Sequence, residues 1–236
     1  MFHFFPRDQH IENVVQPEIP STEKAIVAAA RATENVSWMA RVQNDWIPYP
    51  YNVDVQDANT TLKIPKNKGH EAMVYLSFII ERWTSLPKYT VFVHGHEKAW
   101  HQENDIVPLI QSLRLEALDA EGYVPLRCDW YPSCPREIRP VTHDAIVWGP
   151  GVHREDAEYG IVDAWPIFFP GVELPKTISS QCCAQFAVTN ERIKSRSLET
   201  YVTMREWLLS TTLIDDVSGR VLEKLWAYIF TNETVQ

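Results

Sequence analysis

The chain has 236 residues, of which 45% are hydrophobic and 22% carry a charge. These values are typical of a globular protein with one large domain, and no apolar run approaches the roughly 20 residues of a membrane-spanning helix. The chain carries 22 Lys and Arg against 31 Asp and Glu, so its net charge is −9. This acidic excess argues against broad electrostatic binding of nucleic acid, although it is compatible with a local basic strip.

Residues 1–24 are polar and interrupted by proline, which indicates an N-terminal arm ahead of a single domain over residues 25–236. The arm has no basic start followed by an apolar block, so we expect no secretory signal peptide. Four cysteines are too few for a disulfide framework in a chain of this length. Because the adjacent Cys182 and Cys183 make an awkward bridge, we expect reduced thiols and a cytoplasmic location.

The first part of the domain alternates between strand and helix patterns. Residues 25–32 are almost continuously apolar and predict a buried strand, and residues 33–42 start like a helix. Residues 46–55 contain two prolines and are expected to be extended. The strongest helix prediction covers residues 67–87, where apolar side chains recur at helical spacing on most sides of the segment.

The middle of the chain is less regular. Residues 88–96 are β-branched and aromatic and predict a second strand, and residues 104–118 predict a helix. Residues 122–160 are rich in Pro and Trp, which favours an elaborated loop region. Residues 177–189 are typical of a strand or of a strand that leads into a loop.

Two helices close the chain, over residues 198–211 and 218–230, and Ser218 is expected to cap the second. The alternation of strands and helices predicts an α/β fold. We expect a single domain with a mainly parallel central sheet flanked by helices.

The ligands of such sheets bind at the carboxyl ends of the strands. Arg31 and Glu34 follow the first predicted strand, and His94 and His96 end the strand over residues 88–96. Because these ends meet at one edge of a parallel sheet, we expect the four side chains to line one cleft.

The most distinctive motif is the pair His94 and His96 around Gly95, followed by His101. Three imidazoles can hold a metal ion, but this spacing is not a recognised zinc pattern, so we expect no metal. Histidine exchanges protons near neutral pH, which makes these side chains candidate bases or substrate contacts. Structural hydrogen bonding is the alternative.

Glu71 lies in the first turn of the helix predicted over residues 67–87. The helix dipole alone favours a carboxylate at this position. The functional alternative is that Glu71 faces the cleft, where it binds a cation or orients a base.

Residues 179–186 contain two thiols with an amide on each side. Free cysteines are usually small buried apolar groups, but Cys182 or Cys183 is a candidate nucleophile. A four-thiolate zinc site with Cys128 and Cys134 is disfavoured, because the gap between those two residues is too wide for a zinc knuckle. We find neither a phosphate-cradling glycine loop nor a Gly-x-Ser-x-Gly elbow.

Two local basic strips stand out against the acidic background. Most such clusters are solvated surface, but each is a candidate contact for nucleic-acid phosphates. The strips consist of Lys63, Lys66 and Lys68, and of Arg192, Lys194 and Arg196.

Four segments in this order, residues 67–87, 90–101, 182–193 and 218–230, resemble a fungal family described as a domain of unknown function. The resemblance extends over about residues 25–230. Some soluble members of that family are arginine-containing cyclodipeptide synthases of secondary metabolism.

The resemblance implies an aminoacyltransferase that takes arginyl-tRNA and a second aminoacyl-tRNA and releases an arginine-containing diketopiperazine. An aminoacyl ester is already activated, so neither a metal nor another cofactor is expected. The enzyme must position two esters, deprotonate an α-ammonium group and stabilise a tetrahedral oxyanion.

These requirements assign roles to the residues singled out above. The candidate catalytic residues are Glu71, His94, His96 and Cys183, with Ser180 as an alternative to Cys183 for a covalent aminoacyl-enzyme. A guanidinium pocket needs carboxylates and aromatic walls. The candidate substrate contacts are Glu34, Asp129, Trp100, His101 and Gln185. The two basic strips would follow tRNA phosphates.

The pattern of strands and helices is also similar to the nucleotide-sugar glycosyltransferases of the α/β class, whose fold (glycosyltransferase A) we expect here. The acidic Asp-x-Asp motif of those enzymes is missing, and His94 and His96 stand near its expected position. Histidines suit a hard cation such as magnesium poorly, which disfavours sugar transfer. A glycosyltransferase-like enzyme remains the alternative, and a non-catalytic partner in a biosynthetic cluster is a third hypothesis.

Overall fold

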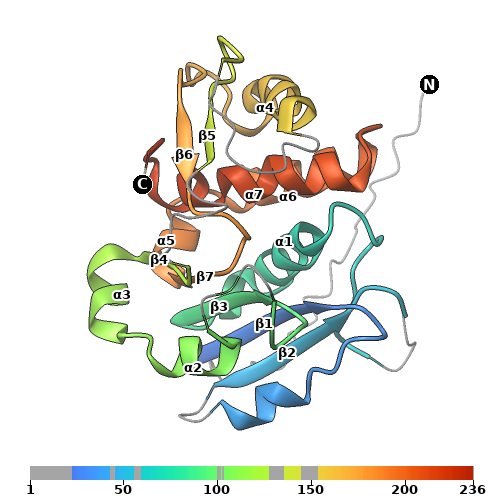
Figure 1. The fold of residues 1–236 in the computed structure, drawn as a ribbon, viewed down its shortest axis with the longest axis vertical. Helices are drawn as coiled ribbons and strands as arrows, with labels where there is room; N and C mark the ends of the chain where they lie inside the picture. The colour runs from blue at the N-terminus through green and yellow to red at the C-terminus, as the bar shows by residue number, and fades with distance from the viewer. Residues whose placement is uncertain are drawn as a thin grey trace, which may run out of the picture.

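A five-stranded sheet lies between two helical layers of the chain (Figure 1). The structure is a computed structural model that describes residues 23–42, 46–55, 60–99, 102, 104–127, 136–144 and 154–235. Within these residues the sheet has the strand order β2-β1-β3-β7-β4. Its strands are β1 (Lys24–Ala30), β2 (Ile47–Asn52), β3 (Tyr89–His94), β4 (Tyr123–Pro125) and β7 (Phe186–Thr189).

The sheet is mixed, so the prediction of a mainly parallel sheet is wrong. β1 runs parallel to both β2 and β3, with Ala25 opposite Ile47 on one side and Thr90 on the other. β7 runs antiparallel to both β3 and β4. The error has a physical origin, because a strand buried on both faces shows the same continuous apolar run in either direction.

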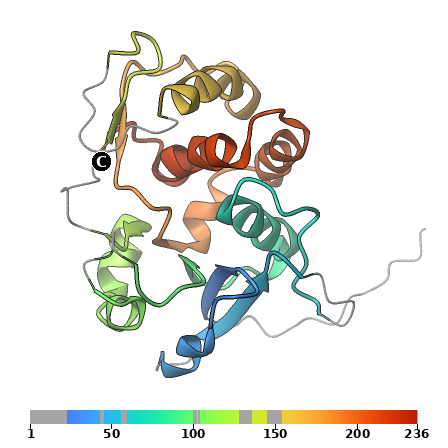
Figure 2. The same cartoon turned by 45° about the vertical axis from the view of Figure 1, so that its right-hand side comes forward.

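The alternation of side chains along each strand builds two separate cores. Ala25 and Val27 of β1 face a large core formed with α1 (Glu71–Glu81), α4 (Arg154–Phe168), α6 (Leu198–Ser210) and α7 (Asp215–Thr231). Ile26 and Ala28 face a smaller core on the opposite side of the sheet. The smaller core is covered by the short helices η1 (Ser37–Arg41), α2 (Ile106–Gln111) and α3 (Leu115–Glu121) (Figure 2).

The predicted central helix is confirmed as α1, whose residues from Ala72 to Ile79 are all buried. Its start is a sharp turn, in which Gly69 and His70 both have positive φ, at 67° and 55°. The backbone amide of Gly69 donates a hydrogen bond to Asp215 Oδ1 at 3.2 Å, and Lys68 Nζ donates to the carbonyl of Leu213. These bonds fasten the start of α1 to the start of α7.

Three further helix predictions differ from the structure in detail. The segment 104–118 forms two helices, α2 and α3, with a break between them. The last helix begins at Asp215 rather than at a Ser218 cap, and the Ser218 hydroxyl donates to the carbonyl of Ile214 from within the helix. The segment 33–42 contains only the 3-10 helix η1.

The helix α4 was missed, because residues 122–160 were expected to be a loop region. Its buried positions Ala157, Ile161, Ala164, Trp165 and Phe168 follow helical spacing. Pro166 inside the helix obscures that pattern, since proline ordinarily breaks a helix.

Shorter elements complete the described chain. They are η2 (Trp83–Ser85), α5 (Asn190–Lys194), and a two-stranded antiparallel sheet of β5 (Arg136–Ile138) and β6 (Ile178–Ser180). No helix in the described ranges combines the length and the apolar character that crossing a membrane requires.

Candidate functional site

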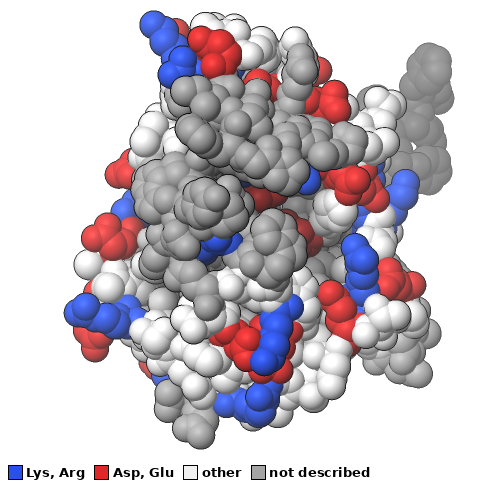
Figure 3. All heavy atoms as spheres, in the orientation of Figure 1, with Lys and Arg blue, Asp and Glu red and all other residues white. Residues whose placement is uncertain are grey.

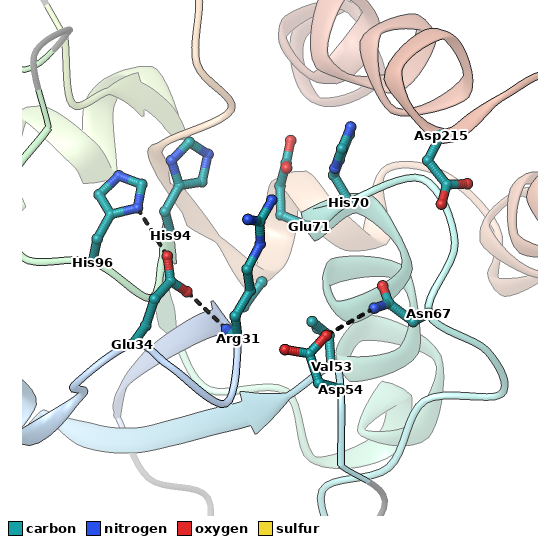
Figure 4. Close-up of a pocket in the computed structure, with 11 residues that line it drawn as sticks. Arg31, Glu34, Val53, Asp54, Asn67, His70, Glu71, His94, His96 and Asp215 are labelled. Carbon is teal, nitrogen blue, oxygen red and sulfur yellow. Dashed lines mark hydrogen bonds and ion pairs between the residues drawn. The ribbon is translucent and has the colours of Figure 1, made fainter.

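A pocket of about 670 Å³ opens where the parallel strands β1, β2 and β3 end (Figure 4). Residues that follow these three strands meet the first residues of α1 and α7 around it. The described lining residues are Ala29, Arg31, Glu34, Val53, Asp54, Asn67, His70, Glu71, His94, His96 and Asp215. The prediction that Arg31, Glu34, His94 and His96 line one cleft is confirmed.

The turn after β1 is fixed by Glu34. Its Oε2 accepts a hydrogen bond from the backbone amide of Arg31 at 2.7 Å, and its own amide donates to the carbonyl of Arg31 at 3.0 Å. Its Oε1 lies 3.4 Å from Nδ1 of His96. Glu34 thus links the end of β1 to the end of β3.

The turn after β3 packs tightly against β1. The amide of Gly95 donates to the carbonyl of Ala29 at 2.8 Å, and the carbonyl of Gly95 accepts a hydrogen bond from Trp38 Nε1 at 2.8 Å. This turn sets the His94 and His96 rings 5.0 Å apart, centroid to centroid, at the pocket wall. The paired imidazoles are therefore held by the smaller core beneath them.

Trp38→Phe is expected to loosen this turn. The substitution leaves the buried carbonyl of Gly95 without its indole donor, which costs about 1–3 kcal/mol of unfolding free energy. Trp165→Phe is the comparison variant, because it removes an indole bond to the carbonyl of Val172 outside the pocket. Val172 is 47% exposed, so water can replace the lost donor, and urea denaturation should show a smaller loss than for Trp38→Phe. Only Trp38→Phe should shift the imidazole NMR signals of His94 and His96. Unshifted signals in Trp38→Phe would contradict the role of the indole.

Glu71 is a lining residue with a strongly perturbed pKa. Burial, followed by the nearby charge of Glu223, raises the pKa of the Glu71 carboxyl to about 8. Tyr75 lies one helical turn further along α1. Its own burial, followed by the charge of Glu71, raises the pKa of its hydroxyl. Glu71 therefore holds a proton near neutral pH, when an ordinary glutamate is ionised.

Glu223 of α7 has the opposite character. Burial opposes its ionisation, but Lys224, the amide of Cys183 and the charges of Arg220 and His94 together lower its pKa. The amide of Cys183 donates to Glu223 Oε1 at 2.9 Å. A protonated Glu71 beside an ionised Glu223 is an arrangement typical of sites that move protons.

The loop between β6 and β7 corrects the prediction of reduced thiols. Cys182 and Cys183 form a disulfide, so the expectation of reduced thiols is wrong for this pair. That expectation rested on the awkwardness of a bridge between adjacent cysteines, and the backbone here has the unusual φ values of 83° at Cys183 and 46° at Ala184. A disulfide sulfur is not a free thiolate, so the disulfide must be reduced before Cys183 can act as the predicted nucleophile.

Several other predicted site residues lie away from the described pocket lining or outside the described residues. Ser180 is buried on β6, and neither it nor Cys183 is among the described lining residues. Gln185 is buried as well, and its Oε1 accepts a hydrogen bond from Gln102 at 3.2 Å. Trp100, His101 and Asp129 lie outside the described residues.

Three of the six residues of the two basic strips are engaged within the fold, and the other three are exposed. Lys68 pairs with Asp215 at 3.2 Å, and Arg192 donates to the carbonyl of Glu121. Arg196 donates to the carbonyls of Tyr228 and Ile229 at the end of α7. The exposed lysines of the strips are Lys63, Lys66 and Lys194. On the face drawn in Figure 3, Lys and Arg are interspersed with Asp and Glu rather than gathered in one basic area.

The sequence did not point to four polar lining residues of the pocket, nor to Glu223, whose charge acts on Glu71. Asp54 follows β2, so the strand-end rule that found Arg31 would have found it too. Asn67, His70 and Asp215 reach the pocket through the contact between the starts of α1 and α7, which no local pattern announces. Glu223 could have been noticed in the sequence, because it is a carboxylate within the apolar run of α7.

No group of three or more His, Cys, Asp or Glu side chains is arranged to hold a metal ion within the described part of the chain. The pocket instead combines four carboxylates, three imidazoles and one guanidinium. These groups are suited to proton transfer and to the binding of charged ligands.

The fold and the pocket together define an α/β protein with a polar site at the ends of parallel strands. Residues 26–236 match the model of a family described as "Protein of unknown function (DUF3431)", and the chain belongs to this family. No curated protein and no solved structure matches the chain.

Proposed function

We propose that this protein is a tRNA-dependent cyclodipeptide synthase, an aminoacyltransferase that joins arginine from arginyl-tRNA to a second aminoacyl group as a diketopiperazine. The observation that carries the proposal is the proton affinity of Glu71 at the pocket. An α-amino group has a pKa of about 8, and the pKa of Glu71 is raised to about 8. Proton transfer from an α-ammonium to the Glu71 carboxylate is therefore nearly balanced in free energy, which suits general acid–base catalysis.

The reaction needs one proton shuttle for each bond formed. Glu71 in its carboxylate form takes a proton from the α-ammonium of one aminoacyl group. The free amine attacks the carbonyl carbon of the other ester, a C–N bond forms, and the C–O bond to the ribose breaks. Glu71 passes that first proton to solvent, takes a second proton from the attacking nitrogen, which becomes the neutral amide, and gives this second proton to the departing ribose oxygen. A second round within the linked dipeptidyl ester closes the ring and releases the second tRNA.

The charge of the pocket supports a cationic aminoacyl group. Glu34 and Asp54 each accept one backbone amide, from Arg31 and Ala32, and each keeps further lone pairs for a ligand. Carboxylates of this kind can bind a guanidinium in bidentate geometry. His94 and His96 would complete the wall on the β3 side, as proton carriers or as hydrogen-bond partners of the ester.

A coupled assay tests the proposal directly. The protein is incubated with total tRNA, ATP, the amino acids and their tRNA synthetases, and the products are read by mass spectrometry. We expect a cyclic dipeptide that contains arginine and that disappears when RNase is added or when the arginyl-tRNA synthetase is left out. The absence of any diketopiperazine across all arginine pairings would refute the proposal.

A glycosyltransferase-like activity is the second candidate, and the position of the pocket is the observation that favours it. Nucleotides commonly bind at the carboxyl ends of parallel strands, where this pocket lies. A manganese-dependent rise in melting temperature with a nucleotide-sugar, together with a negative coupled assay, would favour this candidate.

A further inference from the structure

Arg31 is the only Lys or Arg among the described residues that line the pocket. Its guanidinium forms no hydrogen bond or ion pair with any described residue, although Glu34, Asp54, Glu71 and Asp215 line the same pocket. In Figure 4 the side chain rises into the pocket, between His94 and Glu71 in that view. An arginine among carboxylates ordinarily pairs with one of them, so its separation from all four requires an explanation.

The neighbouring carboxylates are directed elsewhere by the fold. Glu34 binds the backbone amide of Arg31 and faces His96, and Asp54 binds the amide of Ala32 and the side-chain amide of Asn67. Asp215 pairs with Lys68 at 3.2 Å. Each of these carboxylates thus has a partner other than the guanidinium.

The backbone that carries Arg31 is fixed. The Arg31 amide donates to Glu34 Oε2 at 2.7 Å, and its carbonyl accepts the Glu34 amide at 3.0 Å. Only the side chain remains to be ordered when a ligand binds, which reduces the entropic cost of binding.

We propose that Arg31 is the anchor of a phosphate subsite, and that it binds the phosphate of a nucleotide whose remainder extends along the pocket. The planar guanidinium matches a phosphate bidentately, and phosphates commonly bind at the carboxyl ends of parallel strands, which is where Arg31 follows β1. The inference rests on the proposed function for the identity of the nucleotide. In an aminoacyl-tRNA it is the terminal adenosine, whose 5′-phosphate lies one ribose away from the reacting ester.

Binding of adenosine 5′-monophosphate to the purified protein, measured by calorimetry without any tRNA, tests the inference. We expect the wild-type protein to bind the monophosphate, and to bind adenosine at least about tenfold more weakly, because each lost charged hydrogen bond costs roughly 1.5–3 kcal/mol. Arg31→Gln should remove this preference, and Arg31→Lys should keep part of it, because lysine retains the charge without the fork. Arg114→Gln, which alters an exposed arginine that is not among the described lining residues, should bind like the wild type.

Three outcomes would overturn the inference. They are no binding of the monophosphate by the wild-type protein, equal binding by Arg31→Gln, and binding of inorganic phosphate as tight as that of the monophosphate. The last outcome would indicate a general anion site rather than a nucleotide subsite. The assay requires no turnover, so Arg31-dependent binding together with a negative coupled assay would leave the subsite standing and refute the synthase alone.

Discussion

Glu71→Gln is expected to lower turnover about 10²- to 10⁴-fold, the usual contribution of a general acid–base group. Gln keeps the size and the hydrogen-bonding capacity of the side chain but cannot exchange a proton. The wild-type rate should rise with pH toward a midpoint near the Glu71 pKa of about 8, because the carboxylate is the form that accepts the proton. The variant should lose the part of this rise that comes from Glu71 and keep only the part that comes from the substrate α-amino group, whose pKa is also about 8.

Glu81→Gln is the matched control, because Glu81 lies at the opposite end of α1 and is not among the described lining residues. Its activity and pH profile should equal those of the wild type. If Glu71→Gln turned over at the wild-type rate, Glu71 would be excluded as the base, whichever reaction the protein catalyses.

Glu71→Gln is also expected to change the pH dependence of stability, which can be measured without substrate. In the unfolded chain Glu71 ionises near its ordinary pKa of 4.5, whereas the folded protein holds the proton up to about pH 8. The contribution of Glu71 to the free energy of unfolding is therefore fully present below pH 4.5 and decreases as the pH rises to about 8. Glu71→Gln removes that fall, so at pH 9 it should be more stable than the wild type, on the order of 1–3 kcal/mol, and about equal to it at pH 4. Urea denaturation at both pH values measures the difference.

The parts of the site that follow from strand ends could be predicted from the sequence. Arg31, Glu34, His94 and His96 each follow an apolar run, and the geometry of parallel strands brings such residues together. Asp215 and Glu223 could not be placed in this way. Asp215 binds Gly69 and Lys68, and Glu223 acts on Glu71, because α7 packs beside α1. A contact between helices that are far apart in the sequence leaves no local signature.

The remaining differences between prediction and structure arise where tertiary contacts, rather than the local sequence pattern, decide the conformation. β7 has the apolar character of a central strand, but only its pairing with β3 and β4 fixes its antiparallel direction. The loop before it has positive φ at Cys183 and Ala184, which non-glycine residues seldom adopt. The hydrogen bonds of Cys183 to Glu223 and of Tyr75 to the carbonyl of Ala184 hold that conformation, and both partners lie far away in the sequence.

Gly95→Ala is expected to disturb both the sheet and the pocket. A Cβ at this position would lie 2.5 Å from Ala30 Cβ, 2.6 Å from Ala30 Cα and 2.7 Å from Glu34 Oε2. Two of these atoms belong to β1, the middle strand of the parallel part, so no flexible side chain can yield to relieve the contact. Overpacking of this kind costs about 1–3 kcal/mol, and the shift should also displace Glu34 and His96.

Gly171→Ala separates this steric cost from the cost of backbone conformation. Gly171 has a φ of 78°, and a Cβ there would meet no atom within 4 Å. Its replacement should cost about 1–2 kcal/mol through the left-handed backbone alone and should leave the pocket unchanged. Gly95 has no positive φ, so the cost of its replacement comes from contact with β1 and Glu34. We expect the imidazole NMR signals of His94 and His96 to move in Gly95→Ala and to stay fixed in Gly171→Ala. This result would show that glycine is required at position 95 because β3 approaches β1 closely there. Signals unmoved in Gly95→Ala, with stability equal to that of the wild type, would show that the two strands can separate at no cost.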